Sequence, residues 1–599
     1  MNVLGISCFY HDSAACLIRD GEVVAAASEE RFTRKKHDEA FPINAIRYCL
    51  TEGRLLVDDL DYIGFYEKPF IKFKRILFSH VACFPRSFPA FLRAMPSWLH
   101  QKLTIPALIR EELQYDGPVY MIEHHLSHAA SAFLVSPFRE AAVLTVDGVG
   151  EWSTATYGRG ADAKIELFKE ILFPHSLGML YTAFTSYLGF KVNSAEYKVM
   201  GLAPYGTPRY EPQVRELIDV AEDGSFRLNM EYFAYQYGLR MTNERFHRLF
   251  GGPPHDPDAP LEQRHRDIAA SIQAVTEDVM LRMARHLHAE TGLANLCLAG
   301  GVALNCVANG RIMREGPFRD LFIQPAAGDA GGALGVAAYI SNSVLGGPRR
   351  YVMRHAFLGP SYETDEIRAL LQAKGAVFAE IDRQALLETT AHAIADQQVV
   401  GWFQGRMEFG PRALGARSIL ADARNPKNQD VVNLKIKFRE SFRPFAPTVL
   451  REHVADWFEL EGDSPYMLLV AGIAPARRRG MTVEEERLWG IEKLNVVRSE
   501  IPAVTHVDYS ARIQTVRRES NPLYWDIIEA FRRRTGCPVI VNTSFNVRGE
   551  PIVCSPEDSW RCFMRTEMDA LVLETCLLLK EEQPPYVEEK DWRREFALD

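Results

Sequence analysis

The feature that most constrains the fold is a pattern that occurs twice, at residues 2–30 and at residues 141–170. Each copy holds an apolar run, a polar or glycine-containing loop, a second run, a turn and a third run. Such runs predict strands, and the Arg19-Asp20-Gly21 turn predicts a hairpin. Two copies in one chain predict a duplicated domain that clamps a nucleotide between its halves.

Length and composition limit the remaining possibilities. The chain has 599 residues, more than one core supports, and Gly/Pro-rich residues 345–360 mark a boundary between domains 1–350 and 351–599. The net charge of −9 argues against a nucleic acid partner. Without a long apolar run or a signal-peptide pattern, we expect a cytoplasmic protein with no membrane partner. Ten cysteines without a CxxC pair argue against a zinc ribbon.

Residues 121–152 carry a candidate metal site. His124 and His128 precede a run of small residues that predicts a helix, and positions i and i+4 share a helix face, so His125 would face elsewhere. Ordinary polar residues at a helix start are the alternative explanation, because HxxxH alone is a weak signal. Asp329, at a later strand-to-helix turn, could complete the site or could cap the helix.

Glycine-rich turns after apolar runs are candidate nucleotide contacts. One run ends in Asp147-Gly148-Val149-Gly150, where glycines would let backbone N–H groups approach phosphate oxygens and the carboxylate would hold a metal or water. A plain hairpin turn is equally consistent. The turn at Gly300-Gly301 suits the close approach of adenine or ribose. Lys198 is a candidate phosphate contact, and a surface lysine is the simpler explanation for it.

The second domain contains a segment of unusual arginine density. It runs from GRMEFGPRALGARS at residue 405 to KIKFRESFRPFAP. Guanidinium groups bind phosphates in a bidentate manner, so the segment predicts an anion site. Residues 538–546 predict a buried strand that opens into hydroxyl and amide side chains, which could hold a planar amide-like group.

Two further segments have no single interpretation. Residues 29–37 mix both charge signs and could be a solvated loop. Residues 66–115 are aromatic and basic, and their helical periodicity predicts either a lid or an interface.

Taken in order, these motifs resemble one family, the O-carbamoyltransferases that modify nodulation factors and antibiotics. The resemblance covers nearly the whole chain. It is carried by FYHDSAACL, SEERFTRKKHD, EHHLSHAASAF, TVDGVGEW, EYKVMGLAPYG, LAGGVALNC, PAAGDAGGALG, GRMEFGPRALGARSIL, FRPFAP and VNTSFNVRGEPIV.

The resemblance implies an α/β protein with two active sites in series. An N-terminal duplicated actin-like ATPase (ribonuclease H-like) domain would be followed by an α/β domain similar to threonylcarbamoyl-adenylate synthase. The latter would make carbamoyl adenylate from carbamoyl phosphate and ATP with Mg²⁺. The former would transfer the carbamoyl group to a hydroxyl of a sugar, glycoside or polyketide, and the resemblance leaves a homodimer open.

The resemblance also implies roles for individual residues. His11 would be the general base on the acceptor hydroxyl with Asp12 beside it, and an imidazole suits that proton transfer. Fe²⁺ or another divalent metal would be held by His124, His128 and Asp329. Lys437 and Arg439 would act in the adenylate-forming site. Nucleotide, phosphate and carbamoyl contacts would come from Asp147, Gly148, Gly150, Lys198, Gly300, Gly301, Asn305, Arg412, Arg417, Arg443, Arg512, Asn542, Ser544 and Asn546.

Two departures and two alternatives stand beside this prediction. Ser441 stands where the family has proline, and Tyr509 where glycine is commoner. The chain could instead be a catalytically silent nucleotide-binding regulatory protein of actin-like fold. It could also be a tRNA threonylcarbamoyl-type transferase, which the net acidity disfavours.

Overall fold

The computed structural model describes residues 1–100, 102–439, 443, 445–586, 588, 591 and 595–596, so Ser441 lies outside the described residues. Two compact units are present: the first comprises Met1–Glu29 and His37–Met353, the second Glu30–Lys36 and Arg354–Asp599. The chain therefore leaves the first unit after Glu29 and returns to it at His37. In the sequence analysis, residues 1–350 formed one continuous domain.

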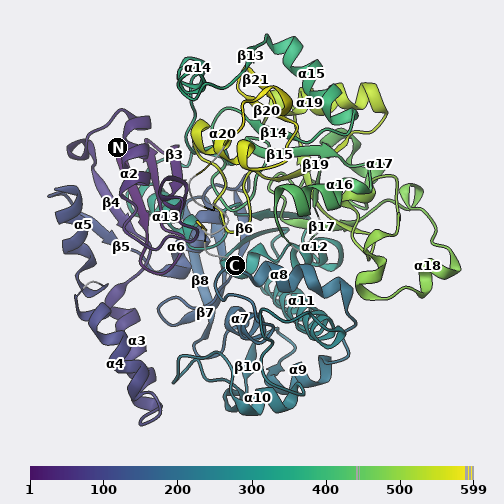
Figure 1. Cartoon of the computed structure of the whole chain (residues 1–599). Helices are drawn as coiled ribbons and strands as arrows, with labels where there is room; N and C mark the ends of the chain where they lie inside the picture. Colours follow the sequence, from purple (N-terminus) through teal and green to yellow (C-terminus); the bar gives the residue numbers. More distant parts are fainter. Residues whose placement is uncertain are drawn as a thin grey trace. The chain divides into compact units, whose positions relative to one another are not determined.

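The first unit contains two five-stranded sheets with the same topology (Figure 1). In each, a strand pairs antiparallel with the two-strand hairpin that follows it and parallel with a later strand, which a fifth strand extends. The first sheet has the order β3 (Glu22–Ser28), β2 (Ala14–Arg19), β1 (Asn2–Ser7), β4 (Tyr62–Phe65), β5 (Val119–Met121). The second has the order β8 (Lys164–Leu172), β7 (Ser153–Ala161), β6 (Glu140–Val146), β11 (Asn295–Ala299), β12 (Asp320–Ile323).

This repeated order is the ribonuclease H-like arrangement, and its duplication confirms the predicted actin-like α/β fold of the first unit. The strands predicted at residues 2–30 and 141–170 are present. The helices of this unit are α2 (Ile43–Gly53), α3 (Pro69–Ala82), α4 (Phe88–His100), α5 (Ile105–Leu113), α6 (His124–Phe133), α7 (Leu177–Tyr187), α8 (Glu196–Leu202), α9 (Glu211–Leu217), α10 (Glu244–Leu249), α11 (Gln263–Thr291), α12 (Cys306–Glu315) and α13 (Ala330–Ala338).

Glycine allows the central helices of the first unit to pack at close range. α13 has the sequence AGGALGVAA and is buried along its whole length. A Cβ added to Gly335 would lie 1.9 Å from the backbone oxygen of Ser127 on α6, and one added to Gly5 on β1 would lie 1.9 Å from the oxygen of Ala333. No side chain fits at either contact. This packing holds α6 and α13, and the site residues they carry, in fixed positions.

The other parts of the first unit lie outside the two sheets. β9 (Ile218–Val220) and β10 (Phe226–Leu228) form a two-stranded ribbon. α3, α4 and α5 follow β4, which confirms the helical periodicity predicted for residues 66–115. Across both units, none of the helices in the described ranges combines the length and the apolar composition needed to cross a membrane.

The second unit is built on a nine-stranded mixed sheet. Its order is β13 (Ala379–Glu380), β21 (Cys576–Leu579), β20 (Ala570–Leu573), β14 (Val400–Phe403), β15 (Arg417–Asp422), β19 (Val539–Ser544), β16 (Ala446–Leu450), β18 (Ser510–Val516), β17 (Leu469–Gly472). Its helices are α1 (Glu30–Thr33), α14 (Thr364–Ala373), α15 (Arg383–Ala395), α16 (Lys427–Asp430), α17 (Val454–Trp457), α18 (Val483–Arg487), α19 (Pro522–Thr535) and α20 (Pro556–Arg565). The α/β class is confirmed for this unit also, while its likeness to threonylcarbamoyl-adenylate synthase stays a prediction.

Within the segment Glu30–Lys36, which belongs to the second unit, Glu30 and Arg31 are buried while Thr33 and Lys35 are exposed, so the solvated-loop interpretation holds only for part of it. Arg31 donates to the backbone oxygen of Gly410 over 2.9 Å. Arg34 donates to Glu550 Oε1 over 2.9 Å and lies 3.4 Å from Asp558. These contacts satisfy the two arginines within the unit, whereas Lys35 is exposed to solvent.

Candidate functional site

Four buried side chains of the first unit converge on one point. Nε2 of His124 lies 3.1 Å from Nε2 of His128 and 2.9 Å from Oδ2 of Asp147. Oδ1 of Asp329 lies 3.7 Å from His124 Nε2 and 3.8 Å from His128 Nε2. All four ligand atoms lie within 4.8 Å of one another, and no residue of the cluster is more than 8% exposed.

The two predicted histidines and Asp329 are thus brought together, and Asp147 joins them. His125 points away, with Nδ1 2.6 Å from Thr145 Oγ1, as the helical spacing predicts. Asp329 occupies the N-cap position of α13 but makes no side-chain cap hydrogen bond, so capping does not explain it. The sequence predicts Asp147 as part of the nucleotide clamp, where its carboxylate could hold a metal or water.

Parallel pairing of β6 with β11 positions Asp147. The carboxyl ends of parallel neighbours lie at one sheet edge, so the turn after β11 meets the turn after β6. Gly300 has φ +93°, and a Cβ there would lie 2.3 Å from the Val146 backbone oxygen. The N–H of Gly301 donates to Asp147 Oδ1 over 2.8 Å, which leaves Oδ2 to face the histidines.

The charges of the cluster favour a cation. Burial raises the pKa of Asp147, but hydrogen bonds from His124 and His128 outweigh it and hold that pKa well below its ordinary value. Burial lowers the pKa of His124 to about 3, so this imidazole is neutral at pH 7. A buried carboxylate beside a neutral imidazole favours a nearby positive charge. Nitrogen and oxygen donors in this number suit Fe²⁺, Mn²⁺ or Zn²⁺, so the residues fit a divalent metal.

His11 and Asp12 lie at the edge of the same cluster. His11 Nε2 is 4.0 Å from Asp329 Oδ2, and His11 Nδ1 is 2.9 Å from Asp12 Oδ2. The other oxygen of Asp12 is 2.7 Å from His37 Nδ1. Burial lowers the pKa of His11, but Asp329 and Asp12 outweigh it and raise that pKa to about 10. His37 was not among the predicted site residues, although the quoted motif SEERFTRKKHD contains it.

Glu151 and Tyr66 support the cluster and were not predicted. Both carboxylate oxygens of Glu151 accept from the backbone N–H of His124 over 3.1 Å, which satisfies the start of α6. Burial raises the pKa of Glu151 to about 7. Tyr66 donates to Asp329 Oδ2 over 3.2 Å. The motif TVDGVGEW contains Glu151, but a backbone contact 27 residues away leaves no local signal.

The remaining predicted nucleotide contacts of the first unit take different positions. Lys198 is only 2% exposed, so the surface-lysine explanation was wrong, and its Nζ lies 5.6 Å from the ring of Phe190. Asn305 caps α12 by accepting from the Ala308 N–H, and its amide pairs with Gln273. Space within 4 Å of a Cβ at Gly148 is open. A Cβ at Gly150 would come within 3.0 Å of His124.

Lys437 is the centre of a second polar cluster, in the second unit. It is 2% exposed, and its Nζ donates to Asn546 Oδ1 over 2.6 Å and to Ser544 Oγ over 3.2 Å. It also donates to the backbone oxygens of both residues. Burial lowers the pKa of Lys437 well below its ordinary value, and the charge of Arg439 lowers it further. The predicted Lys437, Ser544 and Asn546 thus form one constellation around β19.

The arginines of this unit differ in their surroundings. Arg417 is fully buried; its guanidinium stacks 3.5 Å above the Phe403 ring and donates to the backbone oxygens of Gln404, Ala416 and Pro360. Arg417 therefore fixes the backbone of the loop to which it belongs. Arg439 donates to Asn433 Oδ1 over 2.7 Å, and Asn433 in turn donates to the Arg443 backbone oxygen over 3.1 Å.

Asn542 connects two of the predicted segments. Its amide donates to Gln514 over 2.7 Å and to the backbone oxygen of Ala413 over 3.2 Å, so the residue after Arg412 lies against β19. Arg512 lies on β18, two residues before Gln514. Tyr509 has φ +63°, a backbone region that favours glycine and that other residues seldom adopt.

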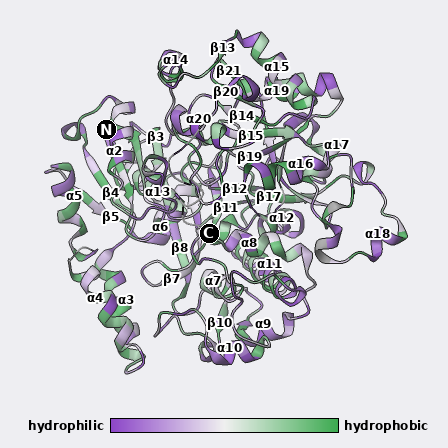
Figure 2. Cartoon of the chain, viewed as in Figure 1, coloured by the Kyte–Doolittle hydropathy of each residue, from purple (hydrophilic) through white to green (hydrophobic). Residues whose placement is uncertain are grey.

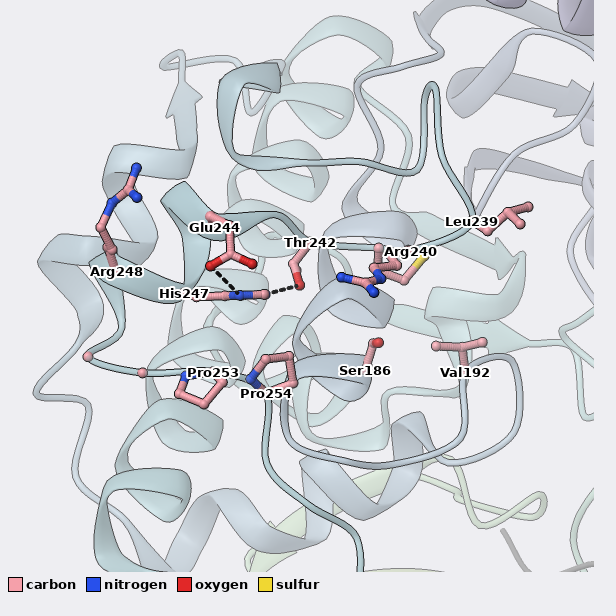
Figure 3. A pocket seen from close by; sticks show the side chains of 13 residues that line it. Ser186, Val192, Leu239, Arg240, Thr242, Glu244, His247, Arg248, Pro253 and Pro254 are labelled. Carbon is pink, nitrogen blue, oxygen red and sulfur yellow. Dashed lines mark hydrogen bonds and ion pairs between the residues drawn. The ribbon is translucent and has the colours of Figure 1, made fainter. Parts of the chain in front are cut away.

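A separate cavity of about 860 Å³ lies beside α10 in the first unit (Figure 3). Its lining contains none of the predicted site residues. His247 is one of its lining residues, with Nε2 3.1 Å from Thr242 Oγ1 and Nδ1 3.6 Å from Glu244 Oε2. The cavity is therefore not the metal-type cluster described above.

The fold and the first cluster together define a class: an α/β protein with an actin-like ATPase fold and a buried site suited to a divalent metal. The Carbamoyltransferase N-terminus family matches residues 2–338, and the Carbamoyltransferase C-terminus family matches residues 391–580. The chain therefore belongs to the carbamoyltransferase family, as its motifs predicted, and it is a transferase.

Relatives agree with this assignment. An uncharacterised protein of Synechocystis sp. is 55% identical over 613 residues, which cover 100% of both chains. Nodulation protein NolNO of Sinorhizobium fredii is 37% identical over 598 residues, 98% of this chain and 81% of that protein. Nodulation protein U of Rhizobium tropici is 27% identical over 574 residues, 92% of this chain and 91% of that protein.

Solved structures align with part of the chain at low scores. Component A of (R)-2-hydroxyglutaryl-CoA dehydratase from Acidaminococcus fermentans has a TM-score of 0.31 at 15% identity and covers 57% of this chain and 97% of its own. HypF of T. kodakarensis has a TM-score of 0.29 at 15% identity. The alignment covers 58% of this chain and 48% of HypF. The fold assignment therefore depends on the sheet topology rather than on these alignments.

Proposed function

We propose that this carbamoyltransferase is an ATP-dependent O-carbamoyltransferase with two sites in series. The second unit makes carbamoyl adenylate from carbamoyl phosphate and ATP, and the first unit transfers the carbamoyl group to a hydroxyl of a sugar or natural product. The observation that supports the proposal best is the chemical difference between the two clusters. One is rich in metal-type ligands and imidazole, and the other is cationic with hydroxyl and amide groups.

The proposed reaction has three steps. Water cleaves carbamoyl phosphate to carbamate and phosphate. A carbamate oxygen then attacks the α-phosphorus of ATP, the α–β P–O bond breaks and pyrophosphate leaves. Finally the acceptor oxygen attacks the carbamoyl carbon, its proton goes to a base, and AMP leaves with the bond electrons.

Lys437 and Arg439 would stabilise the negative charge of the first two steps. Each phosphoryl oxygen that gains charge needs a fixed donor, and a buried ammonium and a guanidinium supply such donors without reorganisation. Ser544 and Asn546 hold Lys437 Nζ through four oxygens, which fixes the position of the charge. The low pKa of Lys437 means that an anion would be needed to stabilise its charged form.

His11 would accept the proton of the acceptor hydroxyl in the last step. Its Nδ1 bond to Asp12 fixes the ring and leaves Nε2 for the hydroxyl. A divalent metal held by His124, His128, Asp147 and Asp329 would supply Lewis-acid polarisation of the carbamoyl group and would offset the carboxylate charge that raises the pKa of His11. We propose Fe²⁺ for this position.

The decisive experiment measures carbamoyl-phosphate-dependent pyrophosphate release, and conversion of α-labelled ATP to carbamoyl adenylate and AMP, without acceptor. We expect activity in wild type and His128→Ala and at least a 100-fold loss in Lys437→Met. The matched control is Lys435→Met, because this lysine is two residues away, exposed and paired with Glu567.

Two results would count against the proposal. If wild type releases no pyrophosphate in response to carbamoyl phosphate, the adenylate route is wrong; nucleotide binding without turnover would then favour a regulatory protein. If Lys435→Met is as inactive as Lys437→Met, the loss does not report on the Lys437 cluster.

A further inference from the structure

The segment from Lys68 to Arg110 contains no acidic residue. The whole chain carries 78 acidic against 69 basic residues, so this stretch reverses the general charge. Its basic residues are Lys68, Lys72, Lys74, Arg75, Arg86, Arg93, Lys102 and Arg110. Helices α3 and α4 fill most of it, and Figure 2 shows hydrophobic and hydrophilic residues alternating along both.

One face of these helices packs inward. Trp98 is 6% exposed, and its ring centroid lies 5.9 Å from that of Phe73. Lys72 is buried and paired with Glu67. Arg75 is also buried, 4.8 Å above the ring of Phe173. The helices are thus anchored on the first unit by this face.

The opposite face exposes large apolar side chains. Phe78, Phe84 and Phe88 are 54%, 69% and 49% exposed, and exposed apolar side chains that lie together mark interaction surfaces. The full apolar set on this face is Phe70, Ile71, Leu77, Phe78, Val81, Phe84, Phe88, Leu92 and Leu99. Three cations, Lys74, Arg86 and Arg93, are exposed among them.

We propose that this outward face of α3 and α4 binds the surface of an anionic phospholipid bilayer. Helices with exposed aromatic and aliphatic residues and only basic charges insert their apolar side chains at the headgroup boundary, where phosphate oxygens neutralise the cations. At 14 and 13 residues, α3 and α4 suit a position in the plane of that boundary. The proposal is independent of the carbamoyl chemistry, and it departs from the sequence-based expectation of no membrane partner.

Charge complementarity favours this occupant over a second copy of the chain. In a two-fold contact the same face meets itself, so Lys74, Arg86 and Arg93 would oppose cations of the other copy. The segment offers no carboxylate to pair with them. An anionic bilayer provides both the apolar layer and the opposite charge.

The test is co-sedimentation of the full chain with phosphatidylcholine vesicles and with vesicles containing one quarter phosphatidylglycerol, at 50 and 500 mM NaCl. We expect binding to the anionic vesicles at low salt, and at least tenfold weaker binding in high salt or without the anionic lipid. Phe78→Ser/Phe84→Ser/Phe88→Ser should weaken binding at least tenfold. Lys74→Glu/Arg86→Glu/Arg93→Glu should weaken it about 100-fold, at roughly tenfold or less per cation.

A matched control reverses three exposed cations elsewhere, as Lys164→Glu/Arg227→Glu/Arg534→Glu, and should leave binding within twofold of wild type. The proposal is wrong if wild type does not sediment with anionic vesicles at 50 mM NaCl, or if the control weakens binding as much as the test variant. It is also wrong if sedimentation velocity shows a dimer that the serine variant dissociates. Should a variant fail to fold by circular dichroism, the lipid and salt dependence of wild type still decides.

Discussion

Asp147 lies closer to the two imidazoles than the sequence predicts. Its place between an apolar strand and two glycines predicts a phosphate loop, yet its Oδ2 atom lies 2.9 Å and 3.7 Å from the two imidazoles. The backbone N–H of Gly301 holds its other oxygen. A carboxylate held in this way acts as a fixed metal ligand more readily than as a mobile contact to phosphate.

We therefore expect Asp147→Asn to lower the affinity for divalent metal at least tenfold, because a neutral amide replaces a charged ligand. Metal content after dialysis, measured by mass spectrometry, checks this. Asp162→Asn is the control, since Asp162 is an exposed residue of the following hairpin. Wild-type metal content combined with weaker ATP binding would return Asp147 to the nucleotide role.

His265 gives a prediction for pH. Its Nδ1 accepts from the Glu262 N–H at the start of α11, so the ring must be neutral there. Burial, then the neighbouring His255 and Arg264, lower its pKa to about 4 from 6.5. Since the unfolded chain binds this proton more readily, stability is lost as pH falls from about 6.5 to about 4, on the order of 2 kcal/mol.

Urea denaturation at pH 7.5 and at pH 5 measures this loss. His265→Gln keeps a side chain able to accept the N–H but cannot titrate, so its pH dependence should be flatter. An equal loss in both proteins would place the acid sensitivity elsewhere.

Single residues were predictable where chemistry and spacing coincide. His124 and His128 are four apart before small residues, and their pairing follows from helix geometry. Glu151, His37 and Tyr66 were not predictable, because each acts through a partner that only the fold brings near. Lys198 was not predictable for the same reason. A lysine beside glycine-rich turns is expected to be exposed, and only the fold shows that this one is buried.

At the scale of elements, strands were easier to predict than the order in which they pair. The hairpins of the two sheets follow from local alternation and turns, whereas the order of the nine-stranded sheet depends on contacts between distant segments. The close contact of α6 with α13 was equally hidden. AGGALGVAA predicts a helix start but not the partner that requires its glycines.

That contact predicts the effect of a single methyl group. Gly335→Ala should destabilise the first unit by about 3 kcal/mol or more, because its Cβ would lie 1.9 Å from the Ser127 oxygen. Gly201→Ala is the control: this helical glycine of α8 has nothing within 4 Å of a Cβ, so stability should rise by about 0.5–1 kcal/mol. Thermal denaturation of both variants measures these changes in stability. Equal behaviour would mean that α13 can shift to admit the methyl group.

At the scale of the whole molecule, the chain path links the two units through Glu30–Lys36. This segment precedes most of the first unit in sequence but belongs to the second. No change in composition marks this segment, because its charged residues resemble those of a solvated loop. The two family matches, which divide the chain at residues 338 and 391, do not mark it either.

Arg34 lies in this segment and contacts residues of the second unit that are far away in the sequence. It holds Glu550 and donates to the backbone oxygens of Pro551 and Ile552 over 2.9 and 2.7 Å. The Glu550 backbone oxygen in turn accepts from Asn546, which contacts Lys437. A residue near the N-terminus therefore supports the cationic cluster of the second unit.

Arg34→Met should leave Glu550 buried without its partner, at a cost of about 3–5 kcal/mol. We expect faster amide hydrogen exchange in residues 544–553 of the full chain and weaker pyrophosphate release, with unchanged exchange in α6 and β6. Arg139→Met is the control, because its pair with Asp162 is exposed and should contribute little. If amide exchange rises equally in both units, Arg34 contributes only to general stability. The proposed support of the Lys437 cluster by this segment is then wrong.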